Sequence, residues 1–525
     1  MLSASVRIPA RAAVAVLAAV VLLAGCGRGE TAVPDDPAVV QTPAGAVRGT
    51  VAADHRLFSG IPYAAPPVGP LRWQPPAPAP TWTGLRDATR PGPRCIQDTS
   101  TDLDRRPTSE DCLSLNVWTP PPSNELRPVV VWIHGGAFLN GSGDIYNARR
   151  LTSRGGIVVV TINYRLGALG FLAHPALGAP GEIGNYGLAD QQAALRWVRD
   201  SIASFGGDPD KVTIAGESAG GMSVCDHLVA PESAGLFRAA IIQSGPCESQ
   251  YDLPTAEKVS AEYAAETGCG DPAAAAQCLR ALPSEKLHMG LFYDNLGSEQ
   301  LSGPVTGTAT LPVDPVTGVA EGRAARVPVL IGSTGDEFTL FAALRYLHGR
   351  PMDAAHYPEL LAEAFGADAD AVAQQYPPDR FGGNVPLAYS AAVTDGDFAC
   401  VADRLADALT KAEPVYAYEF NDRGAPAPES LREAPFPVGA SHSLELRYLF
   451  DVGGAAPLSP AQQRLADQMI DYWSQFVSTG TPDANWPALR GGDAGERMSL
   501  QPDGNHVITT FEQTHQCPFW ASLKG

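Results

Sequence analysis

Residues 216–220 read Gly-Glu-Ser-Ala-Gly, a G-x-S-x-G motif in which a serine hydroxyl could act as a nucleophile. The preceding residues, 211–215, are mostly apolar and β-branched and predict a buried strand, whereas residues 221–229 predict a helix. Strand, tight turn and helix are the context of a nucleophile elbow, and the two glycines remove Cβ atoms that would clash there. We therefore expect Ser218 to emerge at the end of a strand, with the N–H of Ala219 available to a developing oxyanion.

A second apolar run, residues 129–133, is followed by His-Gly-Gly-Ala-Phe at 134–138. Consecutive glycines after a strand let backbone N–H groups approach a substrate oxygen without interference from side chains. Alone, this segment would indicate only a glycine-rich turn that His134 shapes. Together with a serine elbow, it favours a loop that donates hydrogen bonds to an oxyanion.

A nucleophilic serine needs a histidine as general base, and that histidine needs a carboxylate that fixes its tautomer. In a fold with a nucleophile elbow, the acid and then the histidine follow the serine along the chain. Among ten histidines, His442 fits this order best, because it lies in a small-residue loop after a predicted strand at 415–420. His506 and His515, near the C-terminal end, remain alternatives.

The acid is expected after the apolar strand predicted at 328–332, because carboxylates at the C-terminal ends of parallel strands lie where catalytic groups collect. Asp336 and Glu337 both follow that strand. Spacing alone does not choose between the two side chains, so both are candidates at this point.

Several more motifs occur in order along most of the chain, and together they resemble the type-B carboxylesterase family, which includes bacterial para-nitrobenzyl esterases and the cholinesterases. The matching segments are 59–64, 71–73, 110–118, 132–138, 205–220, 335–337, 439–442 and 517–520. Ser114 is a small departure, because the family more often has a larger residue there. The resemblance implies an α/β-hydrolase fold, with a mostly parallel, doubly wound central sheet and helical cap insertions.

The same resemblance implies an activity, the hydrolysis of a small carboxylic ester to acid and alcohol through an acyl-enzyme. The implied catalytic residues are Ser218, Glu337 and His442. The implied oxyanion donors are the N–H groups of Gly136, Ala137 and Ala219, and the implied supporting residue is Glu217. No metal or organic cofactor is implied, and no C-x-x-C or close His/Cys cluster suggests a zinc site.

Two alternative functions belong to the same family. Its non-catalytic cell-surface adhesion proteins keep the fold but lack the nucleophile, whereas this chain has all three triad candidates. Cholinesterase activity is disfavoured, because choline recognition in the family uses a tryptophan in the loop that corresponds to 96–111. This loop has no aromatic residue for a cation–π contact.

The N-terminal residues predict export. Residues 1–25 have two arginines, no acidic residue and an apolar run at 12–23, which is typical of a secretory signal and too short for a membrane span. They end in Leu-Ala-Gly before Cys26, which resembles a lipobox. We expect a signal peptide at 1–25, lipidated Cys26 with a tether at 26–38, and a hydrolase domain at 39–525. The protein would then be anchored on the outer face of the cell membrane, or secreted if the lipobox is not used.

Eight cysteines remain after Cys26, and an even number in an exported chain favours disulfides. The family resemblance implies the pairs Cys95–Cys112, Cys269–Cys278 and Cys400–Cys517. Cys225 and Cys247 are left over, and they are either a fourth disulfide or two buried thiols.

Composition limits the remaining classes of function. The formal charge of −20 argues against nucleic-acid binding, which needs clustered positive charge. Apolar strand runs alternate with helical stretches such as 187–202, which favours a parallel sheet. Residues 251–300 and 340–412 look helical and are expected to form a cap over the site.

Overall fold

The structure is a computed structural model that describes residues 36–99, 106–287, 290–297, 299–491 and 496–523. The predicted signal peptide at 1–25, Cys26 and most of the tether lie outside these residues, so those assignments stay predictions. The first described strand begins at Val39.

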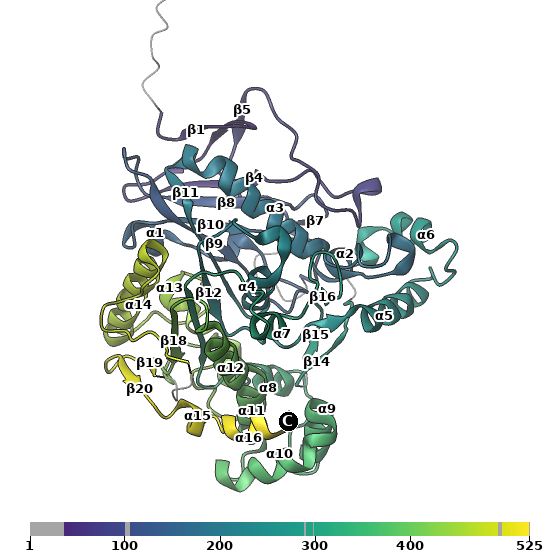
Figure 1. The fold of residues 1–525 in the computed structure, drawn as a ribbon, viewed down its shortest axis with the longest axis vertical. Coiled ribbons are helices and arrows are strands. Elements are labelled where there is room, and N and C mark those ends of the chain that lie inside the picture. The colour runs from purple at the N-terminus through teal and green to yellow at the C-terminus, as the bar shows by residue number, and fades with distance from the viewer. Residues whose placement is uncertain (1–35, 100–105, 288–289, 298, 492–495, 524–525) are drawn as a thin grey trace, which may run out of the picture.

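A large twisted sheet runs through the described chain and contains eleven strands (Figure 1). In spatial order these are β20 (His506–Ile508), β19 (Arg497–Leu500), β18 (Val415–Phe420), β17 (Val329–Thr334), β12 (Ala239–Gln243), β11 (Gly207–Glu217), β9 (Arg127–Ile133), β10 (Val158–Ile162), β8 (Ser114–Thr119), β4 (Arg56–Pro62) and β3 (Thr50–Val51). All neighbours from β19 to β10 are parallel, and the outer pairs are antiparallel. The predicted strands at 129–133, 211–215, 328–332 and 415–420 are thus confirmed as parts of β9, β11, β17 and β18.

The central strands are rich in Val and Ile, which fit a pleated surface that is covered on both faces. Every residue of β10 and of β12 is buried, so packed elements cover both faces of the sheet there. Helices α3, α4, α12 and α14 pack directly against the strands. The helix predicted at 187–202 is confirmed as α3 (Tyr186–Ser201).

The described helices have the following bounds: α1 (Arg149–Ser153), α2 (Gly167–Phe171), α3 (Tyr186–Ser201), α4 (Ala219–Val229), α5 (Leu253–Glu266), α6 (Ala275–Ala281), α7 (Pro315–Ala320), α8 (Thr339–Leu347), α9 (Tyr357–Phe365), α10 (Ala369–Gln375), α11 (Val385–Val393), α12 (Cys400–Leu409), α13 (Leu446–Leu449), α14 (Pro460–Thr479), α15 (Phe511–Thr514) and α16 (Cys517–Leu523). A π-helical turn, η9 (Thr394–Ala399), joins α11 to α12. No helix within the described ranges combines the length and apolar character that a bilayer span requires.

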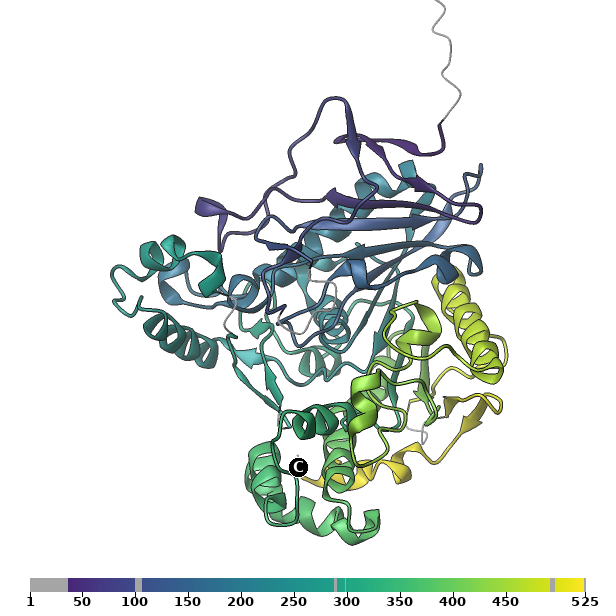
Figure 2. The ribbon, with the colours of Figure 1, turned by 180° about the vertical axis from the view of Figure 1, so that it is seen from behind.

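Smaller sheets lie outside the main one. They pair β1 (Val39–Thr42), β2 (Gly45–Arg48) and β5 (Leu85–Asp87); β6 (Arg94–Cys95) and β7 (Thr108–Ser109); β13 (Tyr251–Asp252) and β16 (Val305–Thr306); and β14 (Asp294–Leu296) and β15 (Glu299–Leu301). The β1–β2–β5 sheet lies at one end of the molecule and helices α9 and α10 at the other (Figure 1). Figure 2 shows the same arrangement from behind.

The expectation of a helical 251–300 is only partly correct. Helices α5 and α6 form there, but β13, β14 and part of β15 also fall in this range. Gly297 has a φ of 58°, which glycine tolerates and which allows the tight reversal that a helix could not accommodate. The second predicted helical region, 340–412, is confirmed from α8 to α12.

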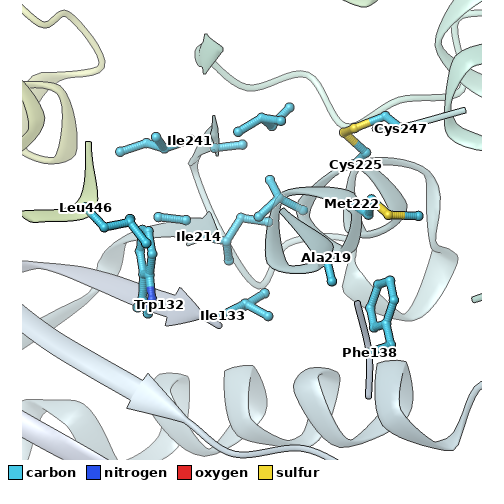
Figure 3. Close-up of a cluster of buried hydrophobic side chains, with 14 of the residues drawn as sticks. Trp132, Ile133, Phe138, Ile214, Ala219, Met222, Cys225, Ile241, Cys247 and Leu446 are labelled. Carbon is cyan, nitrogen blue, oxygen red and sulfur yellow. A yellow bond between two sulfur atoms is a disulfide. The ribbon is translucent and has the colours of Figure 1, made fainter. Parts of the chain in front are cut away.

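Four disulfides join pairs of cysteines in the described ranges, and they include all three pairs implied by the family resemblance. The fourth, Cys225–Cys247, joins α4 to the loop after β12, and both residues are fully buried. Figure 3 shows this bond close to Met222, among the buried side chains around α4. The two cysteines that the sequence left open are therefore a disulfide.

Replacing Cys225 and Cys247 together by alanine is expected to destabilise the fold by about 2–4 kcal/mol, because the unfolded chain gains conformational freedom. Differential scanning calorimetry at one scan rate should show a lowered Tm. The matched control replaces Cys269 and Cys278, which are 9 rather than 22 residues apart, and should lower the Tm less. A Tm equal to that of the unmodified chain in the Cys225/Cys247 variant would contradict this prediction.

Candidate active site

Ser218 lies at the sharp turn between β11 and α4, as the motif predicts. Its φ of 58° and ψ of −124° are unusual for a residue with a side chain. Its N–H donates to the carbonyl of Gln243 on the neighbouring strand β12 (2.9 Å), which fixes the turn. A Cβ atom on Gly220 would lie 2.0 Å from the carbonyl oxygen of Ile133, so only glycine allows α4 to approach the end of β9. Ser218 itself remains partly exposed.

The glycine-rich loop after β9 lies against this turn. A Cβ atom built on Gly135 would be 3.0 Å from the Cβ of Ser218, so the two backbones are in contact. Gly136 and Ala137 have φ values of 113° and 53°. Such a conformation turns successive N–H groups toward one side of the loop. Within the described chain, the N–H groups of Gly136, Ala137 and Ala219 donate to no protein acceptor. These donors are available to an oxygen beside Ser218.

His442 and Glu337 form a buried pair. Nδ1 of His442 lies 2.5 Å from Oε2 of Glu337, and both side chains are almost completely buried. The other carboxylate oxygen accepts a hydrogen bond from the N–H of Thr334 (2.6 Å). Nδ1 therefore donates its proton to the carboxylate, which leaves Nε2 as the reactive nitrogen.

The alternatives that the sequence left open have other positions. Both Asp336 oxygens accept from Arg423 (2.9 and 3.2 Å), and one also accepts from the N–H of Ala440 (2.9 Å), so this carboxylate fixes the loop before His442. His506 is exposed on β20. His515 is buried in a separate cluster, between Asp395 and Glu419.

Glu217, directly before the serine, points at the imidazole. Its Oε1 lies 3.1 Å from Nε2 of His442 and accepts a hydrogen bond from the hydroxyl of Ser443 (2.5 Å). The geometry between Glu217 and Nε2 is not that of a hydrogen bond, and Nε2 has no partner of that kind among the described residues. Because Glu217 and Ser218 are neighbours, the free edge of the ring faces the elbow.

Glu445 was not singled out by the sequence analysis, although it follows His442 by three residues. It is fully buried, and its Oε1 accepts a hydrogen bond from Nε2 of Gln243 (3.1 Å). The side-chain oxygen of Gln243 accepts in turn from the indole N–H of Trp473 (2.9 Å). The only sign in the sequence that Glu445 could lie near the site was its position three residues after His442.

Two phenylalanines were also missed. The rings of Phe341 and Phe398 lie 5.3 Å and 5.4 Å from the imidazole of His442, centroid to centroid. Phe341 comes from α8 and Phe398 from the π-helical turn η9. In the sequence, aromatic residues in predicted helices indicate only core packing. The fold is what places these two rings beside the histidine.

The carboxylates control the charge of the site. Burial disfavours the imidazolium, but the negative charges of Glu217 and Glu337 and the hydrogen bond to Glu337 outweigh it and raise the pKa of His442 from 6.5 to about 9. Burial, with the charges of Glu217 and Glu337, raises the pKa of Glu445 to about 8. Burial also raises the pKa of Glu217. The site therefore holds a positive imidazole more readily than solvent does.

The chain is similar to known enzymes over most of its length. The profile of the Carboxylesterase family matches residues 36–520. The chain belongs to this family. It is 36% identical to a fumonisin B1 esterase from Sphingopyxis macrogoltabida over 490 residues, covering 87% of each chain. It is 35% identical to a para-nitrobenzyl esterase from Bacillus subtilis (strain 168), covering 86% of this chain and 92% of that one.

Solved structures agree with the family. A thermophilic PNB esterase superposes with a TM-score of 0.79 at 31% identity, covering 92% of this chain and all of that one. This carboxylesterase therefore has the predicted α/β-hydrolase fold, and it is a carboxylic-ester hydrolase. Among its described residues, no group of three or more His, Cys, Asp or Glu side chains is placed to hold a metal ion.

Replacing Glu217 by glutamine should lower the pKa of His442 from about 9, because a negative charge 3.1 Å from Nε2 is lost while burial is kept. Histidine labelled with ¹³C at Cε1 reports this pKa by NMR, and His442→Asn assigns its resonance. Glu262→Gln, an exposed carboxylate on α5, is the control and should leave the pKa unchanged. An unaltered titration in Glu217→Gln would disprove the interpretation.

The sign of the effect on stability follows from the raised pKa. The His442 imidazolium stabilises the folded carboxylesterase fully below about pH 6.5, and this contribution is lost as the pH rises through about 9. The Glu217→Gln variant should lose this contribution to stability at a lower pH than the unmodified chain.

Proposed function

We propose that this chain is an exported serine carboxylesterase that hydrolyses small carboxylic esters through an acyl-enzyme, with Ser218, His442 and Glu337 as its triad. The observation that carries the proposal is the buried His442–Glu337 pair, whose free nitrogen edge faces the serine elbow. Family membership supports ester hydrolysis as the reaction.

In the first half-reaction, Nε2 of His442 takes the proton of the Ser218 hydroxyl, and the serine oxygen attacks the ester carbonyl. The carbonyl oxygen becomes an oxyanion that the N–H groups of Gly136, Ala137 and Ala219 stabilise. The imidazolium then protonates the departing alcohol, and the acyl group stays on the serine oxygen. In the second half-reaction, His442 takes a proton from water, the hydroxide releases the acid, and the serine regains its proton.

The carboxylates around His442 favour these proton transfers. Glu337 accepts the Nδ1 proton and orients the ring. Glu217 lies beside Nε2, and its negative charge stabilises the positive charge that the ring gains when it takes the serine proton. Phe341 and Phe398 give the imidazole an apolar wall that excludes water from one side.

The relatives act on chemically different esters by name, among them fumonisin B1 and para-nitrobenzyl esters. We therefore propose a small-molecule carboxylic ester as substrate without a narrower acyl or alcohol preference. An adhesion role, the alternative from the family, is disfavoured because this chain has a candidate nucleophile, base and acid.

Replacing Ser218 by alanine should leave the fold intact and reduce kcat for para-nitrophenyl acetate by about 10⁴-fold or more, because no nucleophile remains. Release of para-nitrophenol from a series of para-nitrophenyl esters measures this loss and gives the preferred acyl length. An equally active Ser218→Ala chain would sink the proposal, and a folded but inactive unmodified chain would favour a binding role.

The neighbouring carboxylates provide the matched control for the triad. Glu337→Gln should reduce kcat by roughly 10⁴-fold, because the amide no longer fixes the tautomer of His442. Asp336→Asn should cost far less in kcat and should lower the Tm, because Asp336 only holds the loop through Arg423 and Ala440. The reverse ranking would assign the acid to Asp336.

We also propose that residues 1–25 are a signal peptide and that Cys26 carries a lipid. The lipobox-like Leu-Ala-Gly-Cys sequence supports this. The first described strand, β1, lies at the edge of the molecule, away from α9 and α10 (Figure 1), where a tether would leave the fold accessible.

Replacing Cys26 by alanine should move the esterase from the membrane fraction to the soluble fraction of a bacterial host. Metabolic labelling with an alkynyl fatty acid should mark the unmodified chain and not the variant. Turnover of para-nitrophenyl acetate by both proteins is the control for folding. A variant that stays equally membrane-bound would remove the lipid-anchor proposal.

A further inference from the structure

A cleft of about 430 Å³ lies outside the active site, between α11, the segment before α16 and the loops that carry Asp336 and Gly439. We call it the α11 cleft. Its volume is that of a small-molecule pocket. Apolar side chains form much of its wall, including Phe381, Leu387 and Pro437. The proposed ester hydrolysis does not use this space.

Most charges on the wall are already paired. Asp336 accepts from Arg423 (2.9 Å), as described above. Asp395 accepts from His515 (2.5 Å) and from the hydroxyl of Tyr376 (2.8 Å). Because these side chains already have partners, they do not favour either an anionic or a cationic ligand in the cleft.

Arg380 on the wall differs from these paired residues. Arg380 donates from Nη1 to the carbonyl of Gln375 (2.6 Å) and has no carboxylate partner within the described ranges. The guanidinium of Arg380 is exposed, so its remaining N–H groups are available to an anion in the cleft. Ser390 also lines the cleft, but its hydroxyl has almost no accessible surface and does not take part in the site.

We propose that the α11 cleft is a second ligand site, and that it binds a carboxylate with an apolar chain. The guanidinium of Arg380 would bind the carboxylate, and the apolar chain of the ligand would lie along Phe381 and Leu387. Carboxylic acids of this kind are what the proposed function releases, and the identification of the ligand as a product rests on that function. The site itself rests only on the cleft.

The cleft and the candidate triad share structural elements. Thr394 and Asp395 line it, and they belong to the π-helical turn η9 that also presents Phe398 to His442. Asp336, which directly precedes Glu337, lies on the same wall. A bound acid should therefore change kcat, because it contacts the elements that hold the imidazole.

Sodium octanoate is the probe, with octan-1-ol as the uncharged control, and isothermal calorimetry measures binding to the chain. Reaction with phenylmethylsulfonyl fluoride first blocks Ser218, and mass spectrometry confirms the adduct. The blocked chain should still bind octanoate, and octan-1-ol should bind about tenfold more weakly, because it lacks the charge-assisted hydrogen bond.

The variants test the assignment to this cleft. Arg380→Gln should weaken octanoate binding about tenfold, and so should Ala391→Trp, which fills the cleft. Arg326→Gln, an exposed arginine elsewhere, is the matched control and should bind normally. Arg380 is exposed, so its replacement should fold even if Ala391→Trp does not.

Three results would overturn the proposal: no binding to the blocked chain, equal affinity in Arg380→Gln, or purely competitive inhibition of para-nitrophenyl acetate turnover that persists in Arg380→Gln. The last would place the acid in the catalytic pocket. A chain that phenylmethylsulfonyl fluoride does not label would count against Ser218 as nucleophile and not against the cleft, because calorimetry with the Arg380 variant is independent of labelling. The site is supported if octanoate changes kcat in the unmodified chain but not in Arg380→Gln.

A comparison of acids identifies the source of the ligand. If only acids whose esters the chain hydrolyses bind, the ligand is a product of the proposed reaction. If other acids bind as well, the ligand is a carboxylate from another source.

Discussion

The hydrogen bond between Nδ1 of His442 and Glu337 joins two loops whose residues are 105 positions apart, and the active site depends on it. Both groups give up their hydration in the interior, which is costly unless each polar atom has a partner. Thr334 satisfies the second carboxylate oxygen, and the partly charged pair strengthens the first contact. The ring then has one orientation, with Nε2 left for other chemistry. Loss of His442 would leave the buried Glu337 carboxylate with the N–H of Thr334 as its remaining hydrogen-bond donor among the described residues.

The sheet determines that this pair and the serine elbow lie at the same end of the strands. Glu337 follows the end of β17, Ser218 the end of β11, and the glycine loop the end of β9, all at the same edge of parallel neighbours. Contacts between backbones bring these loops close, because glycine at 135, 216 and 220 leaves no Cβ between them. The serine elbow and the glycine loop are therefore in contact, and Glu217 in the elbow lies 3.1 Å from Nε2 of His442.

A buried histidine between two carboxylates occurs twice among the described residues. His515, like His442, lies between two carboxylates, and Asp395, Glu419 and their charges raise its pKa to about 10 despite burial. Its Nδ1 and Nε2 both have close carboxylate partners, so no ring nitrogen is left over. At His442, Nε2 lacks a hydrogen-bond partner among the described residues and faces the elbow. Geometry around the ring, rather than burial or charge, distinguishes the structural cluster from the candidate catalytic one.

The sequence alone determined the strands, the elbow and the chain order of the functional residues, because apolar runs, glycines and turn positions report local conformation. Spacing left open whether Asp336 or Glu337 is the acid, since adjacent residues differ mainly in where their side chains point after folding. The sequence also left open whether Cys225 and Cys247 form a disulfide or are two buried thiols. Phe398 was missed, because nothing in the sequence shows that its ring will pack against His442. Glu445 was missed too, although it follows His442 by only three residues. Only the tertiary structure decided these cases, since burial, pairing and pKa are set by neighbours that lie far away along the chain.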